Sequence, residues 1–239
     1  MTDNHGLFDT IRSNLAPVHP DGYKFVGIAG GVAVLLWLIL PWSVLAYVAL
    51  GIMAYVAYFF RDPARVSPLR EGLVVAPGDG RISSIDTVRP PPELGLDETP
   101  RLRISIFLSV FDVHVNRSPV AGRITRSVYV PGAFLNAALD KASEDNERRA
   151  LVITQPSGIE IAVVQIAGLI ARRIVTFKGE GDSLGVGERF GLIRFGSRVD
   201  VYLPPGRTAL VAVGQRAVGG ETILADLKST EPEREARAS

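Results

Sequence analysis

The longest apolar run of the chain lies near its start. No charged residue occurs between Lys24 and Arg61, whereas one perpendicular helix needs only about 20 apolar residues to cross a bilayer. Pro41 divides the run, because proline breaks a helix. We therefore predict two apolar helices, Phe25–Leu40 and Val44–Phe60, that form a hairpin dipping into or crossing a membrane.

Basic residues flank this run on both sides: Lys24 before it, and Arg61, Arg65 and Arg70 after it. Because lysine and arginine are enriched in cytoplasmic loops, both ends of the hairpin are predicted to lie in the cytoplasm. The run begins too late and is too long for a cleavable signal peptide. A pair of buried core helices is the soluble alternative, although soluble cores rarely run this far without a charge. Residues 1–24 are predicted to form a surface arm before the hairpin at 25–60.

From Arg61 onward the pattern changes to short alternations of apolar and polar residues, separated by Gly, Pro and Asp. This period of two is typical of half-buried strands. The predicted strands are Leu73–Ala76, Arg81–Val88, Arg103–Val110, Arg123–Val130, Ala150–Thr154, Glu160–Gln165, Gly191–Phe195, Arg198–Leu203 and Thr208–Val213. Helical spacing favours one helix, at Ala133–Arg149. The pattern indicates an α+β fold in which a mostly antiparallel β domain, 61–227, follows the hairpin and precedes a charged, disordered tail at 228–239.

Composition excludes several classes of function. The 239 residues carry a formal net charge of +1, whereas a nucleic-acid-binding protein would normally show a concentrated basic face. The absence of cysteine excludes disulfides, thiolate nucleophiles and cysteine-ligated metals. With only three histidines, no metal site is predicted.

Three places in the predicted β domain hold groups suited to catalysis. Asp79 lies between two glycines, His114 is the only histidine of the domain, and Gly196-Ser197 joins two predicted strands. A carboxylate, an imidazole and a hydroxyl are the parts of an activated serine. Each group also has an ordinary structural explanation: an aspartate that caps its own turn, a packed histidine, and a tight turn or β-bulge. Spacing alone does not show that the three meet.

These stretches belong to a longer series of blocks that resembles the short-form phosphatidylserine decarboxylase proenzymes. The matching blocks occur in the family's order: Tyr58–Pro63, Ala76–Gly80, Phe111–Pro119, Tyr129–Gly132, Phe134–Asn136, Asp140–Arg148 and Phe195–Ser197. Any one block is weakly specific, but together they cover nearly the whole chain, from about Pro20 to Leu227.

The resemblance implies a zymogen that cuts itself between Gly196 and Ser197. Its two chains, 1–196 and 197–239, would stay together as a heterodimer, and any further oligomerisation is left open. Ser197 would become a covalent pyruvoyl cofactor at the start of the smaller chain. That group would form a Schiff base with phosphatidylserine in the bilayer and release phosphatidylethanolamine and CO₂, as pyridoxal phosphate does for other amino acids. The implied location is the bacterial inner membrane, with the catalytic domain on the cytoplasmic side.

Asp79, His114 and Ser197 match the family's maturation residues. In this interpretation His114, oriented by Asp79, removes the Ser197 proton, and the Ser197 oxygen attacks the Gly196 carbonyl. Longer family members carry a second histidine where this chain has Phe111. Protonation of the product would then fall to His114, Asp79 or water.

Two other classes of function would need sequence features that differ from those of a decarboxylase. A membrane-anchored serine hydrolase would use the same three residues but would want a Gly-x-Ser-x-Gly elbow, which the chain lacks around Ser197. A non-enzymatic membrane adaptor would carry long coiled-coil heptads, which are also missing. The polar block Asp140–Arg148 is expected to line the pocket or to hold the two chains together. The alternative is a solvated charged face.

Overall fold

The computed structural model describes residues 16–40, 43–135, 145–168, 173–194, 196–229, 231–232 and 234. The chain divides into two compact units, Met1–Ala64 and Arg65–Ser239. The first unit is helical and the second is built from strands, so the predicted α+β fold is confirmed.

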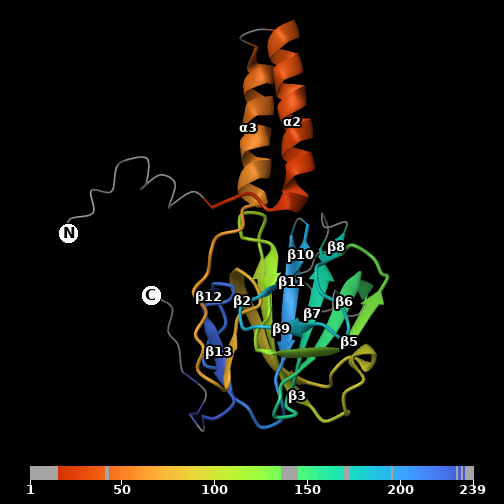
Figure 1. The fold of residues 1–239 in the computed structure, drawn as a ribbon, viewed down its shortest axis with the longest axis vertical. Coiled ribbons are helices and arrows are strands. Elements are labelled where there is room, and N and C mark those ends of the chain that lie inside the picture. Colours follow the sequence, from red (N-terminus) through yellow and green to blue (C-terminus); the bar gives the residue numbers. More distant parts are fainter. Residues whose placement is uncertain are drawn as a thin grey trace, which may run out of the picture. The chain divides into compact units, whose positions relative to one another are not determined.

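The first unit is a pair of antiparallel helices, α2 (Pro20–Ile39) and α3 (Val44–Phe59), that run side by side (Figure 1). Helix α2 begins at Pro20 rather than at the predicted Phe25. The reason is its start signal: the His19 side chain accepts a hydrogen bond from the Asp21 N–H, and Pro20 occupies the first helical position. The start of α3 agrees with the prediction, and Ser43 caps it.

The helices are apolar over much of their exposed surface. Ile28, Leu38 and Val44 are 66%, 73% and 76% exposed. Helix α2 contains an 18-residue window with a mean hydropathy of 1.8. Its 20 residues span about 30 Å, which matches the hydrocarbon thickness of a bilayer. Among the described helices only α2 is long and apolar enough to cross a membrane, and α3 is a shorter apolar helix.

The second unit consists of three antiparallel sheets. The largest has the strand order β12-β2-β3-β11-β7-β6-β5-β9, a smaller one β4-β10-β8, and the third pairs β1 with β13. The strands are β1 (Leu73–Val75), β2 (Gly80–Val88), β3 (Arg101–Leu108), β4 (Val115–Arg117), β5 (Gly122–Val130), β6 (Arg148–Thr154), β7 (Glu160–Ala167), β8 (Ile174–Thr176), β9 (Ser183–Leu184), β10 (Arg189–Ile193), β11 (Ser197–Tyr202), β12 (Arg216–Ala217) and β13 (Ile223–Asp226); one 3₁₀ turn, η1, covers Pro92–Leu94. Strand β11 lies in the middle of the largest sheet, between β3 and β7 (Figure 1).

The main core lies on one face of the largest sheet. Ile106 and Leu108 of β3 and Val199 of β11 belong to it, together with Phe190 and Ile193 of the smaller sheet. The two sheets therefore pack across this core. Because side chains alternate along a strand, Tyr202 and its neighbours on β6 and β7 form a separate, smaller cluster on the opposite face.

Two predicted elements differ from the structure. The segment Thr208–Val213 forms no strand: Ala209 and Val211 are buried, but a turn follows directly, in which the Gln215 N–H donates to the Ala212 carbonyl. The Leu210 N–H donates to the Leu224 carbonyl of β13, but no ladder of paired residues forms here among the described residues. Burial of alternate residues alone mimicked the strand pattern.

The predicted helix Ala133–Arg149 does not reach its predicted end. Ala133 forms an isolated bridge with Asn146, and Arg148 already begins β6. The middle of this stretch, 136–144, and most of the predicted tail lie outside the described residues. Strands β4, β8, β9, β12 and β13 were not predicted, since two to four residues are too few for a periodic signal.

Candidate active site

The candidate site lies at the end of the largest sheet where β11 begins. Ser197, the first residue of β11, is opposite Leu108 of β3 and Ala167 of β7. Its side chain is completely buried. Within the described part of the chain its hydroxyl has no hydrogen-bond partner. A buried polar group of this kind requires an explanation.

The backbone just before Ser197 crosses from one sheet to the other. Strand β10 ends at Ile193 in the smaller sheet, and β11 begins at Ser197 in the largest. Gly196 makes the crossing with φ = 61°, a left-handed conformation that glycine adopts without steric cost. Among the described residues, a Cβ atom there would approach only Val110, at 4.0 Å, so the backbone angle rather than crowding requires glycine.

His114 directs one ring nitrogen at this crossing. Its Nδ1 lies 3.0 Å from the Asp112 carbonyl oxygen, and the Gly196 N–H donates to its Nε2 at 3.2 Å. A carbonyl can only accept and an N–H can only donate, which assigns the proton to Nδ1 and the lone pair to Nε2. The ring is wholly buried. The structure therefore presents a neutral imidazole whose basic nitrogen faces the residue that precedes Ser197.

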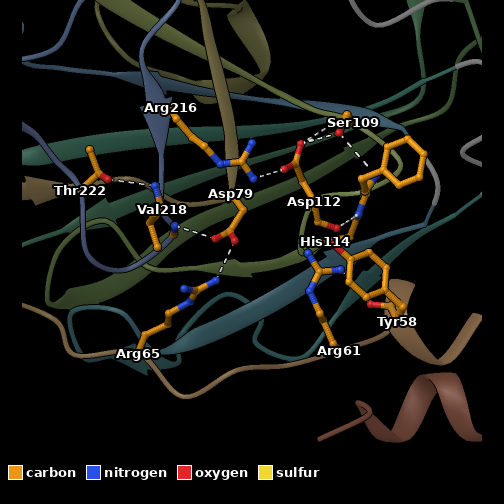
Figure 2. A network of polar contacts seen from close by, with 12 residues as sticks. Tyr58, Arg61, Arg65, Asp79, Ser109, Asp112, His114, Arg216, Val218 and Thr222 are labelled. Carbon is orange, nitrogen blue, oxygen red and sulfur yellow. Dashed lines mark hydrogen bonds and ion pairs between the residues drawn. The ribbon is translucent and has the colours of Figure 1, made fainter. Parts of the chain in front are cut away.

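A tight turn holds the Asp112 carbonyl in place. The Asp112 carboxylate accepts hydrogen bonds from the N–H and the hydroxyl of Ser109, at 2.8 and 2.7 Å, and pairs with Arg216 (Figure 2). Burial alone would raise the pKa of Asp112, but the Ser109 and Arg216 contacts outweigh it and hold that pKa below its ordinary value. Arg216 lies on β12, so this turn joins segments from both sides of Ser197.

Asp79 lies at the same end of the sheet, in the turn between β1 and β2. Its carboxylate pairs with Arg65 at 2.6 Å and accepts the Gly219 N–H at 2.8 Å (Figure 2). One strand, β3, separates β2 from β11, so the two backbones are about 10 Å apart. The sequence predicted that Asp79 orients His114. The Nδ1 hydrogen bond goes to the Asp112 carbonyl, and the role of Asp79 toward the ring stays a prediction.

The block Asp140–Arg148 reaches this end of the sheet through Asn146. Its side-chain amide donates to the carbonyls of Leu135 and Ala167 and accepts from the Leu135 N–H. Ala167 is the partner of Ser197 on β7. Asn146 therefore fixes the described start of this loop beside the site, while residues 140–144 lie outside the described part of the structure.

Sequence reasoning missed several residues that shape the site. Arg65 and Asp112 were not predicted as site residues. Arg65 lies 14 positions from its partner Asp79, and Asp112 contacts His114 through a backbone carbonyl, which residue type does not reveal. Gln165 could have been found, since it is the only polar residue in the interior of the apolar stretch 161–167. No group of three acidic or histidine side chains that could hold a metal occurs within the described residues.

Comparison with known proteins agrees with this geometry. A family model described as phosphatidylserine decarboxylase matches residues 52–225. A protein of Azorhizobium caulinodans named phosphatidylserine decarboxylase proenzyme is 61% identical over 220 residues, which cover 92% of this chain and 93% of that protein. Proteins with the same name from Nitrobacter winogradskyi and Xanthobacter autotrophicus are each 59% identical over 223 residues, 93% of this chain and 89% and 94% of theirs. The chain therefore belongs to the phosphatidylserine decarboxylase family of enzymes.

Proposed function

We propose that this chain is a self-processing, pyruvoyl-dependent decarboxylase that converts phosphatidylserine to phosphatidylethanolamine and CO₂ at a membrane surface. Family membership supports the reaction class. The mechanism rests on one observation about the Gly196–Ser197 bond. A left-handed glycine precedes it, a buried hydroxyl without a hydrogen-bond partner among the described residues follows it, and a neutral imidazole nitrogen lies 3.2 Å from the Gly196 nitrogen.

In the first step of maturation the Ser197 oxygen attacks the Gly196 carbonyl carbon. A C–O bond forms, the C–N bond between the two residues breaks, and the hydroxyl proton passes by way of His114 to the Ser197 nitrogen. The product is an ester with a free amine. His114 suits this transfer because its Nε2 carries a lone pair while Nδ1–H is held by Asp112.

Elimination and hydrolysis complete the processing. Loss of the Ser197 Cα proton and of the Cβ–O bond releases Gly196 as a carboxylate and leaves dehydroalanine. Its imine tautomer takes up one water and releases ammonia, so that chain 197–239 begins with a pyruvoyl group. The net reaction consumes one water and produces two chains and one ammonia.

The surroundings of Ser197 fit such a group. Residue 197 is buried between Leu108 and Ala167, and its side-chain oxygen carries no hydrogen bond within the described residues that would hold it as a structural serine. When bound there, a pyruvoyl ketone supplies an electrophile for the substrate amine and an electron sink for the carbanion left by CO₂ loss. The chain's own contribution is to bury and align residue 197 and to place His114 beside it.

The sheet arrangement supports the proposal that the two cut chains stay together. Of the strands after residue 196, β11 pairs with both β3 and β7 along its whole length, β12 pairs with β2, and β13 pairs with β1. Every partner strand belongs to 1–196. Cutting one bond removes none of these ladders, so the smaller chain is expected to remain inserted in the middle of the largest sheet.

The apolar helix pair supports action at a membrane, with phosphatidylserine in the bilayer as the substrate. We assign α2 and α3 to the inner membrane and the sheet domain to the cytoplasmic side, on the basis of Lys24 and Arg61 at their ends. An enzyme tethered in this way meets its lipid substrate without extracting it from the bilayer.

Protonation of the product is assigned to His114 or to water. Phe111, which stands where longer family members have a second histidine, is 63% exposed and cannot transfer a proton. Asp79 pairs with Arg65, which favours its ionised form and makes it a poor donor.

The serine hydrolase alternative finds no support in the geometry. A hydrolase presents its serine on an exposed elbow, whereas Ser197 is buried and paired on both sides within a sheet. The adaptor alternative is set aside because the relatives are enzymes.

The decisive experiment is the intact mass of the protein purified in detergent. We expect chains 1–196 and 197–239, with the smaller one lighter than a serine-initiated chain by one ammonia and heavier by two hydrogens after borohydride treatment. An active preparation that contains a single chain of 25.7 kDa would rule out self-cleavage.

A further inference from the structure

Gln165 is a buried polar residue on the same face of the sheet as Ser197. On β7, Ala167 is opposite Ser197 and Gln165 is opposite Val199, and residues two apart on a strand share a face. Diagonal neighbours on paired strands lie about 7–8 Å apart, within reach of a long side chain. Gln165 can therefore reach the place where residue 197 reacts.

The orientation of the Gln165 amide is fixed by a second amide. Its Nε2 donates to Asn116 Oδ1 at 2.7 Å, and Asn116 Nδ2 points at the Pro77 carbonyl at 3.5 Å. Flipping Gln165 would set two oxygens against each other, and flipping both amides would set Asn116 Oδ1 against the Pro77 oxygen. The contacts therefore direct Nε2 toward Asn116 and identify Oε1 as the amide atom without a partner among the described residues.

The neighbouring strand leaves room for this amide. A Cβ atom on Gly191 of β10 would lie 2.8 Å from the Val175 oxygen, 3.0 Å from Gln165 Nε2 and 3.4 Å from Oε1. Gly191 is also opposite Asn116 in the smaller sheet. The Gln165 amide thus lies between the two sheets, anchored to the strand that follows His114.

A structural role explains the Nε2 atom of the Gln165 amide but not its Oε1 atom. The Nε2 contact joins β7 to β4 and so ties the two sheets together. The Oε1 atom is buried and has no hydrogen-bond partner within the described residues. The Ser197 hydroxyl on the same face also has no partner there, so it does not donate to Oε1. The described part of the chain thus leaves this acceptor unsatisfied, which is unfavourable unless another donor completes it.

We propose that Gln165 is a specificity-determining residue whose Oε1 accepts a hydrogen bond from the primary amine of the lipid headgroup as that amine approaches residue 197. Asn116 positions the amide. The inference rests on the proposed function, because it requires residue 197 to be the point of attachment. A primary amine suits the Oε1 acceptor because it is a hydrogen-bond donor that arrives with the substrate. It still carries one N–H after it has lost one hydrogen on bonding to residue 197.

The test compares amine capture by the wild-type protein and a Gln165→Met variant. Both are incubated in detergent with phosphatidylserine and cyanoborohydride, and the fraction of the 197–239 chain that gains lipid mass is followed over time. Methionine has a similar length but no strong acceptor. We expect normal self-cleavage and capture slowed about tenfold, the scale of one hydrogen bond.

Two variants serve as controls. Gln155→Met makes the same chemical change just beyond β6, at the end of the β6–β7 hairpin far from Ala167, and is expected to leave cleavage and capture unchanged. Gln165→Glu keeps an acceptor oxygen at the same reach. Because burial favours the neutral carboxylic acid, its O–H can replace the Nε2 donor toward Asn116 Oδ1, and the variant is expected to recover most of the lost capture.

The outcomes separate the two proposals. A wild-type chain that never cuts itself defeats the proposed function. Normal cutting with normal capture in Gln165→Met defeats this inference alone, as does equal loss in the Met and Glu variants. Slow cutting in Gln165→Met would assign the residue to maturation and would also overturn the inference.

Discussion

The two faces of strand β11 carry buried polar groups of opposite kinds. On one face, Arg198 and Asp200 satisfy each other through two hydrogen bonds of 2.9 Å each, and they are 3% and 0% exposed. On the other face, the Ser197 hydroxyl of β11 and Oε1 of Gln165, on the neighbouring strand β7, have no partner among the described residues. Adjacent residues of one strand therefore differ in whether the fold completes their hydrogen bonding.

This difference distinguishes polar groups that stabilise the fold from polar groups that are available for a reaction. A buried ion pair of this kind satisfies both charges within the fold, whereas an unsatisfied group is tolerated where a reaction needs it. Lack of a partner is not sufficient by itself: Ser105, opposite Asp200, also has an unpartnered hydroxyl within the described chain. What distinguishes Ser197 is the neighbouring Gly196 crossing and the His114 nitrogen.

The largest expected effect comes from removing the reactive group. Ser197→Ala should leave a full-length, inactive chain, because both cleavage and the ketone require the hydroxyl oxygen. The burial of residue 197 predicts that alanine is accommodated and that the fold is kept. Denaturing electrophoresis and intact mass are the measurements, and normal cutting in this variant would contradict the mechanism.

Next in size is the loss of the imidazole. His114→Ala should slow self-cleavage at neutral pH by about 10²- to 10⁴-fold, the usual contribution of a positioned base. The measurement is the time course of chain cutting after synthesis. His19→Ala, which removes the cap of α2 in the helical unit, is the matched control and should cut normally. Cutting of His114→Ala at the wild-type rate would require another base.

The opposite face of β11 should respond in stability rather than in chemistry. In an uncut Ser197→Ala background, Arg198→Met leaves the Asp200 carboxylate buried without its two hydrogen bonds from Arg198, while the Arg103 charge stays close to it. The loss should cost about 3 kcal/mol in the free energy of unfolding, the lower end of the cost of breaking a buried pair. Replacing both residues, as Arg198→Met with Asp200→Leu, should recover most of that loss. Denaturant unfolding of the three chains provides the measurement, and a single-variant loss below about 1 kcal/mol would show that the pair is not structural.

The smallest expected effect concerns the turn that holds His114. The pKa of Asp112 is lowered in the folded state, so its contribution to stability is present above its ordinary value of 3.8 and is lost as the pH falls through the lowered pKa. Because Arg216 is largely exposed, we expect about 1 kcal/mol. In Asp112→Asn, the free energy of unfolding, measured by denaturant unfolding, should depend less on pH between pH 5 and about pH 2. An unchanged curve would show that this carboxylate does not contribute.

Local sequence determined much of this protein. The charge-free run and Pro41 determined a pair of apolar helices, because helix formation and its interruption depend on neighbouring residues. Alternation predicted the longer strands, and the order of short motifs identified the family. Asp79, His114, Gly196 and Ser197 were all named from residue type and motif.

The tertiary structure decided how those residues are placed. Only the pairing of β11 with β3 and β7 shows that Ser197 is buried and that its chain can be cut without losing a ladder. Only the tertiary fold sets His114 Nε2 beside Gly196, which is 82 positions away. Gln165 and Asn116 are 49 positions apart, so no local pattern joins their amides. Such contacts form where distant segments bury a common core, and spacing along the chain carries no information about them.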